Sequence, residues 1–139
     1  MIAFVNITIL NNDHENVGGC VITDTNGTII GEISSYYPNS NAIYAAYKTF
    51  QLAGQLCRRM GAYSTLIVRT NSFPMIKELN GDVTYNTTLF NQTKRYMKDF
   101  NYLATTFDAN TNEYRRTMEL AQKALNETRT FTKVYKNAV

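Results

Sequence analysis

The residues whose types and spacing could do chemistry gather around Asn71, at the end of a short apolar stretch. Residues 65–68 are largely β-branched and do not alternate in polarity, which is typical of a central strand buried on both faces. Asn71 and Ser72 interrupt this stretch, and a short helix with Pro74 in its first turn follows. Open α/β sheets place their sites where such a strand ends. The sequence therefore predicts that function depends on Asn71, which is a neutral amide.

The other reactive side chains are isolated along the chain. His14 is the only histidine, so neither a zinc cluster nor a Ser-His-Asp site is supported. Cys20 and Cys57 lack metal-binding spacing and are predicted to be buried thiols of a reducing compartment. Glu113 is the best remaining acid, although the helix dipole alone favours a carboxylate in a first helical turn. No metal site and no cofactor is predicted.

Basic and aromatic residues alternate at several places, a pattern that suits a polyanionic partner. Lys and Arg contact phosphates, and aromatic rings provide platforms for bases. Arg69 also stands close to Asn71. The candidate nucleic-acid-binding residues are Arg69, Lys94, Arg95, Tyr96, Lys98, Arg115 and Arg116. Solvation of helix faces would explain the same residues, and both interpretations stay open at this point.

Composition bounds the class of protein. A chain of 139 residues, 44% hydrophobic and 18% charged, is expected to form one globular domain over residues 1–139. No apolar run approaches the roughly 20 residues that span a bilayer, and the N-terminal stretch is typical of a strand, not of a signal peptide. We therefore expect a cytoplasmic protein with no membrane partner. The net charge of +3 permits nucleic-acid binding without demanding it. A composition rich in Asn, Thr and Tyr and free of Trp is typical of a low-GC, viral or phage genome.

Hydrophobic patterning predicts the elements that position these residues. They are a three-strand antiparallel meander at 1–36, a first helix at 41–60, a central strand at 64–70, a short helix at 72–80, a helix at 87–100, a fifth strand at 101–107 and a last helix at 113–127. Asn26-Gly27 supplies a hairpin turn within the meander. The polar, basic tail from residue 128 is expected to fray.

Three stretches, in this order, resemble the type 1 ribonuclease H family. Gly18-Gly-Cys-Val-Ile-Thr-Asp-Thr-Asn-Gly27 looks like its second strand and hairpin. Asn39-Ser-Asn-Ala-Ile-Tyr-Ala-Ala-Tyr47 looks like the start of its first helix, and Thr70-Asn-Ser-Phe-Pro-Met-Ile-Lys-Glu-Leu-Asn-Gly81 looks like the segment after its fourth strand. The resemblance covers nearly the whole chain. It implies an α/β, ribonuclease H-like fold with a five-stranded mixed sheet, in the order 3-2-1-4-5, flanked by helices.

The family hydrolyses phosphodiesters with two metal ions held by carboxylates. The resemblance carries the four carboxylate positions onto Asn6, Ile43, Asn71 and Met118. An offset of two residues from Asn6 remains open, because the loop before Gly18 is slightly long for the family. Each matched position has lost its negative charge, and Ile43 and Met118 cannot ligate a hard cation. We therefore expect a pseudoenzyme in which Ile43 and Met118 fill the emptied pocket together.

Three functions remain as hypotheses. The first is non-catalytic association with duplex, hybrid or single-stranded nucleic acid through a basic and aromatic surface. The second is a protein-interaction or assembly scaffold, with a protein partner or self-association, because a fold does not fix a function. The third, a minor alternative, is a divergent metal-dependent nuclease that uses Glu113 and the asparagines.

Overall fold

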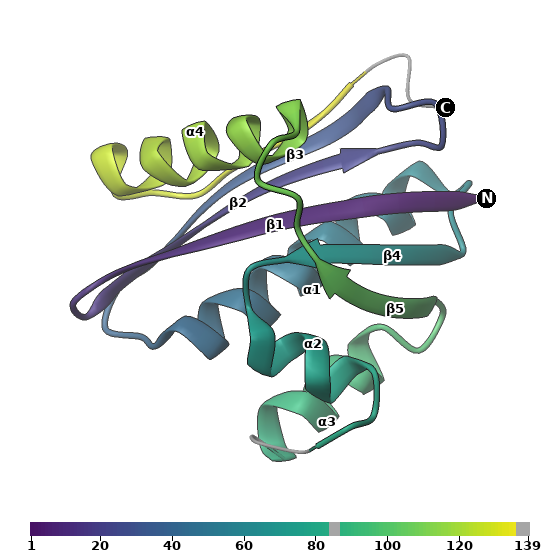
Figure 1. The fold of residues 1–139 in the computed structure, drawn as a ribbon, viewed down its shortest axis with the longest axis horizontal. Coiled ribbons are helices and arrows are strands. Elements are labelled where there is room, and N and C mark those ends of the chain that lie inside the picture. Colours follow the sequence, from purple (N-terminus) through teal and green to yellow (C-terminus); the bar gives the residue numbers. More distant parts are fainter. Residues whose placement is uncertain (84–86, 136–139) are drawn as a thin grey trace.

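Strand β1 (Ile2–Asn12) lies inside the single sheet of the computed structural model, which describes residues 1–83 and 87–135. It pairs antiparallel with β2 and parallel with β4, in a sheet of order β5-β4-β1-β2-β3-β6. The other elements are β2 (Glu15–Thr23), β3 (Ile29–Tyr37), α1 (Ala42–Met60), β4 (Thr65–Thr70), α2 (Phe73–Leu79), α3 (Thr87–Tyr96), β5 (Asn101–Thr106), α4 (Asn112–Glu127) and β6 (Phe131–Val134). Figure 1 shows α4 on one side of the sheet and α1, α2 and α3 on the other.

The predicted strand order 3-2-1-4-5 is confirmed, and the sheet has one strand more than the sequence predicted. The segment expected to fray forms β6, which pairs antiparallel with β3 at the sheet edge. Its polar residues Thr132 and Lys133 are exposed while Phe131 and Val134 are half-buried, so its apolar signal is too weak to stand out. Residues 136–139 of the predicted tail lie outside the described part of the chain.

The hairpin between β1 and β2 is tight. Pairing continues to Asn12 and Glu15, so only Asp13 and His14 form the turn. Asp13 adopts the left-handed conformation that such a short turn requires, with φ 53°. His14 therefore lies at the tip of a long hairpin, far along the strands from Asn71.

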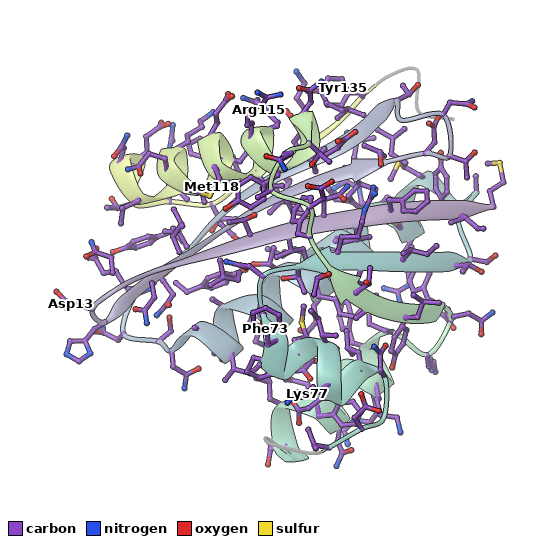
Figure 2. All side chains as sticks on the ribbon, viewed as in Figure 1. Asp13, Phe73, Lys77, Arg115, Met118 and Tyr135 are labelled. Carbon is purple, nitrogen blue, oxygen red and sulfur yellow. The ribbon has the colours of Figure 1, made fainter. Side chains whose placement is uncertain are left out.

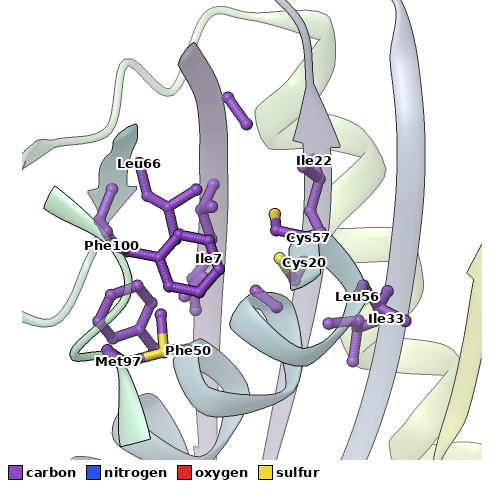
Figure 3. Packing of buried hydrophobic residues seen from close by; sticks show 14 of the residues in the cluster. Ile7, Cys20, Ile22, Ile33, Phe50, Leu56, Cys57, Leu66, Met97 and Phe100 are labelled. Atoms are coloured by element: carbon purple, nitrogen blue, oxygen red, sulfur yellow. The ribbon is translucent and has the colours of Figure 1, made fainter. Parts of the chain in front are cut away.

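The larger hydrophobic core lies between the sheet and α1. Alternate residues of β1, among them Val5, Ile7 and Ile9, point toward this face, as expected for a strand with a period of two. Phe50 and Leu56 of α1 pack against them, in the region drawn in Figure 3. Figure 3 also shows Met97 and Phe100, which follow α3, closing the core below β4.

The opposite face of the sheet is covered by α4 through small and polar residues. Its apolar cluster consists of Val17, Ala121 and Ala124, with Leu10, Tyr36 and Leu125 at its margin. A Cβ added at Gly19 would overlap the carbonyl oxygen of Thr117, so the helix backbone rests directly on β2. Ser34 on β3 donates a hydrogen bond of 2.5 Å to the carbonyl oxygen of Leu120.

Glu32 of β3 is hydrogen-bonded to α4 and to Tyr135, the residue that follows β6. Arg116 donates to both of its carboxylate oxygens, at 2.6 and 3.1 Å, and the hydroxyl of Tyr135 donates at 2.7 Å. Burial alone would raise the pKa of Glu32, but the hydrogen bonds from Arg116 and Tyr135 outweigh it and hold the pKa below its ordinary value. No helix in the described part of the chain is long and apolar enough to cross a membrane.

Acid is expected to weaken this attachment. Because folding lowers the pKa of Glu32, its carboxylate stabilises the folded state above the ordinary carboxyl range, and that contribution is lost as the pH falls through the lowered value. Glu32→Gln should cost about 2 kcal/mol of unfolding free energy at neutral pH. It should also flatten the dependence of stability on pH between about pH 7 and about pH 3, measured by urea unfolding.

The matched control is Glu119→Gln, which removes an exposed carboxylate that also contacts Arg116, at 3.0 Å. Exposed pairs contribute little, so its cost should stay below about 0.5 kcal/mol. Equal losses in the two variants would contradict the role assigned to Glu32.

Candidate functional site

Asn71 lies at the tip of β4 and is hydrogen-bonded to the backbone of β1. The parallel register ends with Ile7 opposite Thr70, so Asn71 continues it beyond the last strand residue. Its Nδ2 donates to the carbonyl oxygen of Ile9 at 3.0 Å, and its Oδ1 accepts from the Ile9 N–H at 2.9 Å. The side chain thus imitates one more residue of the ladder, and both polar ends of the amide are engaged.

Asn80 makes the same kind of contact with β5, the strand that flanks β4 on the side away from β1. Its Nδ2 donates to the carbonyl oxygen of Ala104 at 2.8 Å and its Oδ1 accepts from the Ala104 N–H at 2.9 Å. Asn80 ends α2 and occupies the outer edge of β5, where it takes hydrogen-bonding groups that would otherwise be open. Two asparagines with identical bonding indicate a structural use of the amide.

A chain of hydroxyl groups connects β1 to α4 beside Asn71. Thr117 donates to the carbonyl oxygen of Tyr114 at 2.6 Å, which leaves Thr8 as the donor in the 2.7 Å contact between the Thr8 and Thr117 hydroxyls. Both threonines are fully buried. Beside the exposed Asn71, the buried groups Thr8 and Thr117 are therefore neutral and bonded within the protein.

The residue of β1 nearest to Asn71 along the register is Thr8, two positions after Asn6. Asn6 is fully buried, and its Nδ2 donates to the carbonyl oxygen of Val21 on β2 at 2.8 Å. Thr8 is thus the β1 side chain beside Asn71, and both Asn6 and Thr8 are neutral.

Ile43 and Met118 do not fill one pocket, contrary to the sequence-based expectation. Ile43 packs against the core on the α1 side of the sheet. Met118 lies on α4, on the opposite side (Figure 2). It lines a surface hollow with Gln122 and Asn126. Thr117, one residue earlier, is the α4 side chain that faces β1. A step of one residue turns a helical side chain by about 100°, which explains the error.

Glu113 stands in the first turn of α4, whose N-cap is Thr111. Within residues 1–83 and 87–135, no three His, Cys, Asp or Glu side chains are grouped so that they could hold a metal ion. The position of Glu113 fits the favourable interaction of a carboxylate with a helix N-terminus.

The seven candidate nucleic-acid-binding residues are divided among three places. Lys94, Arg95, Tyr96 and Lys98 are exposed together at the end of α3. Arg69 lies on the α4 side of the sheet with its guanidinium 4.5 Å from the centre of the Phe4 ring.

Arg115 and Arg116 lie on α4, across the sheet from α3, and both engage neighbouring side chains. Arg115 donates to Asn112 and Arg116 is committed to Glu32 and Glu119. Of the seven candidates, the α3 group is therefore the one that presents several exposed cations on one surface, at the opposite end of the molecule from Arg115 (Figure 2).

Next to that group, two hollows run between α1 and α3, and we call them together the α1–α3 groove. The first, about 260 Å³, is lined by Tyr37, Tyr44, Lys48, Gln51, Leu52 and Tyr96. The second, about 410 Å³, is lined by Asn41, Tyr44, Thr88, Leu89, Gln92 and Arg95. Sequence reasoning found Arg95 and Tyr96 but missed Lys48.

The groove is held by contacts between α1 and α3. Gln51 donates to the hydroxyl of Thr93 at 2.9 Å in the interior, and Lys48 donates to Gln92 at 3.3 Å at the surface. A Cβ at Gly54 would overlap the sulfur of Met97, so this glycine lets the segment after α3 approach α1. Burial raises the pKa of Tyr37 to about 12, so its phenol stays neutral at physiological pH.

The sequence matches no protein-family model and no curated protein. Its structure, however, is similar to solved ribonuclease H structures. The N-terminal RNase H domain of Rv2228c from Mycobacterium tuberculosis is 12% identical with a TM-score of 0.74, covering 88% of this chain and 98% of that one. RNase H1 from the halophilic archaeon Halobacterium salinarum NRC-1 is 16% identical with a TM-score of 0.75, covering 91% and 99%.

LC11-RNase H1, isolated from compost by a metagenomic approach, was solved in complex with an RNA/DNA hybrid. It is 19% identical with a TM-score of 0.78, covering 91% of this chain and 98% of that chain. These likenesses confirm the ribonuclease H-like fold that the three sequence stretches predicted.

Restoring a carboxylate at position 71 is expected to destabilise the protein. In Asn71→Asp, an oxygen would replace the Nδ2 that lies 3.0 Å from the Ile9 carbonyl oxygen, and two acceptors would face each other. Because Asn71 is exposed and water can solvate the new oxygen, we expect a loss of about 0.5–1.5 kcal/mol in urea unfolding, without recovery on addition of Mg²⁺. Asn110→Asp, at an exposed loop position, is the control and should be nearly neutral. An Asn71→Asp variant as stable as the parent would show that the two hydrogen bonds between Asn71 and the Ile9 backbone do not stabilise the protein.

The hydroxyl chain predicts an asymmetric mutant cycle. Thr117→Val leaves the Thr8 hydroxyl without its acceptor inside the protein, and should cost about 1–3 kcal/mol. Thr8→Val leaves Thr117 bonded to Tyr114 and should cost less. The double variant should lie close to Thr8→Val alone, because both partners are gone. Additive losses in thermal or urea unfolding would show that the two hydroxyls do not act together.

Proposed function

We propose that this protein is a non-catalytic ribonuclease H-like protein that associates with nucleic acid. The observation that carries the first half is the bonding at the tip of the central strands. Asn71 is clamped to Ile9, and Thr8 and Thr117 bond to each other, in the region where the family resemblance expects metal-holding carboxylates. Two divalent cations beside a phosphate need several negative oxygens, and neutral groups already bonded to the protein do not offer them.

Association with nucleic acid is supported by the fold and by the exposed end of α3. One structure with the same fold was determined with an RNA/DNA hybrid bound. In this chain Lys94, Arg95 and Lys98 are exposed around the end of α3, and Tyr96 of the same segment is 40% exposed. Several cations and an accessible aromatic ring on one segment suit a sugar-phosphate backbone whose bases can be contacted.

The test is binding and cleavage measured with the same labelled probes. Hybrid, duplex and single-stranded oligonucleotides are titrated at low salt with Mg²⁺ or Mn²⁺ present, and the products are separated on a denaturing gel. We expect binding to at least one probe that weakens about tenfold or more between roughly 50 and 200 mM salt, because counterions are released. We expect no metal-dependent cleavage of any probe.

Two outcomes would contradict this proposal separately. Cleavage that needs a divalent ion and disappears in Glu113→Ala would establish the divergent nuclease. If the protein binds none of the probes at low salt, nucleic acid is not its partner.

A scaffold for protein assembly is the second candidate, because part of the sheet is not covered by a helix. On the α4 side, Leu103 of β5 is 50% exposed and Ile2 of β1 is 38% exposed. Ile67 of β4 lies half-buried between these two strands. Exposed apolar patches of this kind mark interaction surfaces when they are large enough.

A further inference from the structure

We propose that the α1–α3 groove binds unpaired nucleotides of a single strand, with bases against its tyrosine rings and phosphates beside Lys48 and Arg95. The inference rests on the proposed association with nucleic acid and names the form of nucleic acid that this surface takes.

The groove presents aromatic rings in a fixed arrangement. Tyr44 lines both hollows and is 40% exposed, as is Tyr96. Tyr37 meets Tyr44 edge to face, with ring centres 6.0 Å apart and planes at 90°. The hydroxyl of Tyr37 is itself bonded to Thr49 of α1 at 2.9 Å. Tyr44 is thus supported from beneath while its ring remains accessible, which is the arrangement of a stacking platform.

Positive charge stands beside these rings. The ammonium of Lys48 lies 5.5 Å from the centre of the Tyr44 ring, and Arg95 lines the second hollow. Arg58 lies 5.2 Å from the Tyr96 ring and donates to the Tyr96 carbonyl oxygen at 2.7 Å, although its charge is partly offset by Asp99 at 3.5 Å. Among the described residues that line the two hollows, there is no carboxylate. This balance favours a polyanion over a cationic or neutral partner.

The helices that carry these residues are rigidly joined. The buried Gln51–Thr93 hydrogen bond and the contact of Met97 with Gly54 fix α3 against α1. Neither contact involves an exposed ring, so the platform is in place before a ligand arrives. A ligand that meets a preorganised surface loses less free energy to ordering of the protein.

The shape of the groove distinguishes a single strand from a duplex. Hollows of about 260 and 410 Å³ admit single planar groups that enter between the two helices. Bases within a duplex are stacked on each other and expose only their edges, whereas unpaired bases offer their faces to aromatic side chains. Stacking on tyrosine needs only such a face, so the groove should accept most sequences.

The experiment compares Tyr44→Leu with Tyr44→Phe on a labelled single-stranded oligothymidine and on a DNA duplex, at low salt. Loss of the ring should weaken binding of the single strand about tenfold, whereas Tyr44→Phe keeps the ring and should stay within about twofold of the parent. Because the chain has no Trp, its intrinsic fluorescence comes from tyrosine. Stacking should quench this emission, and Tyr44→Phe should bind with a smaller quench.

Matched controls place the same changes outside the groove. Tyr114→Leu removes a ring on α4, and Lys133→Gln removes a cation on β6. Both should leave single-strand affinity within about twofold, while Lys48→Gln should reduce the salt dependence by the equivalent of about one phosphate contact. Circular dichroism spectra and melting curves confirm that each variant is folded.

The outcomes separate this inference from the function on which it rests. Equal losses of single-strand affinity in Tyr44→Leu and Tyr114→Leu, or equal reductions of salt dependence in Lys48→Gln and Lys133→Gln, would show that the α1–α3 groove is not the binding site. Association with nucleic acid itself would not be contradicted. A preference for duplex that Tyr44→Leu does not change would do the same. Failure of the parent protein to bind any probe would overturn both.

Discussion

The docking of α4 on the sheet depends on one close approach, that of its backbone to Gly19. With no Cβ in the way, the carbonyl of Thr117 can rest on β2, and the Thr117 hydroxyl reaches Thr8 on the neighbouring strand. Arg116, next to Thr117, donates to Glu32, and Ser34 donates to the carbonyl oxygen of Leu120 farther along the helix. The position of α4, and with it the closure of the central strand tips, therefore follows from a missing methyl group and a few directional bonds.

The two faces of the sheet consequently differ in what holds them. On the α1 side, large side chains such as Phe50 and Leu56 are buried, and their stability comes from apolar area, which tolerates small displacements. On the α4 side, small residues leave little apolar area, so each buried polar group needs its partner in place. Beside the exposed Asn71, the buried Thr8 and Thr117 hydroxyls occupy the α4 side of the central strands, where an unpaired buried charge would be costly.

Much of the fold was predictable from the sequence because periodicity survives in single elements. The alternation of Val5, Ile7 and Ile9 and the apolar stripe of residues 41–60 each indicate their own element. Strand β6 was not predictable in this way, because it is short and has only two half-buried apolar residues: Val134 packs against the core, and Phe131 lies between the cations of Lys123 and Arg129. The site was harder still: Thr8 and Thr117 are bonded across 109 positions of sequence, and no local pattern distinguishes Thr117 from Met118.

The same reasoning explains why the groove, and not the strand tip, is the better surface for a ligand. At the tip, Asn71, Thr8 and Thr117 already satisfy their hydrogen bonds within the protein, so a ligand there would have to break bonds before making its own. In the α1–α3 groove the bonds that position the helices lie beneath the exposed rings, and the rings themselves remain accessible. The same fold can therefore combine neutral, internally bonded groups at the strand tip with an accessible surface elsewhere, because the two are stabilised by different contacts.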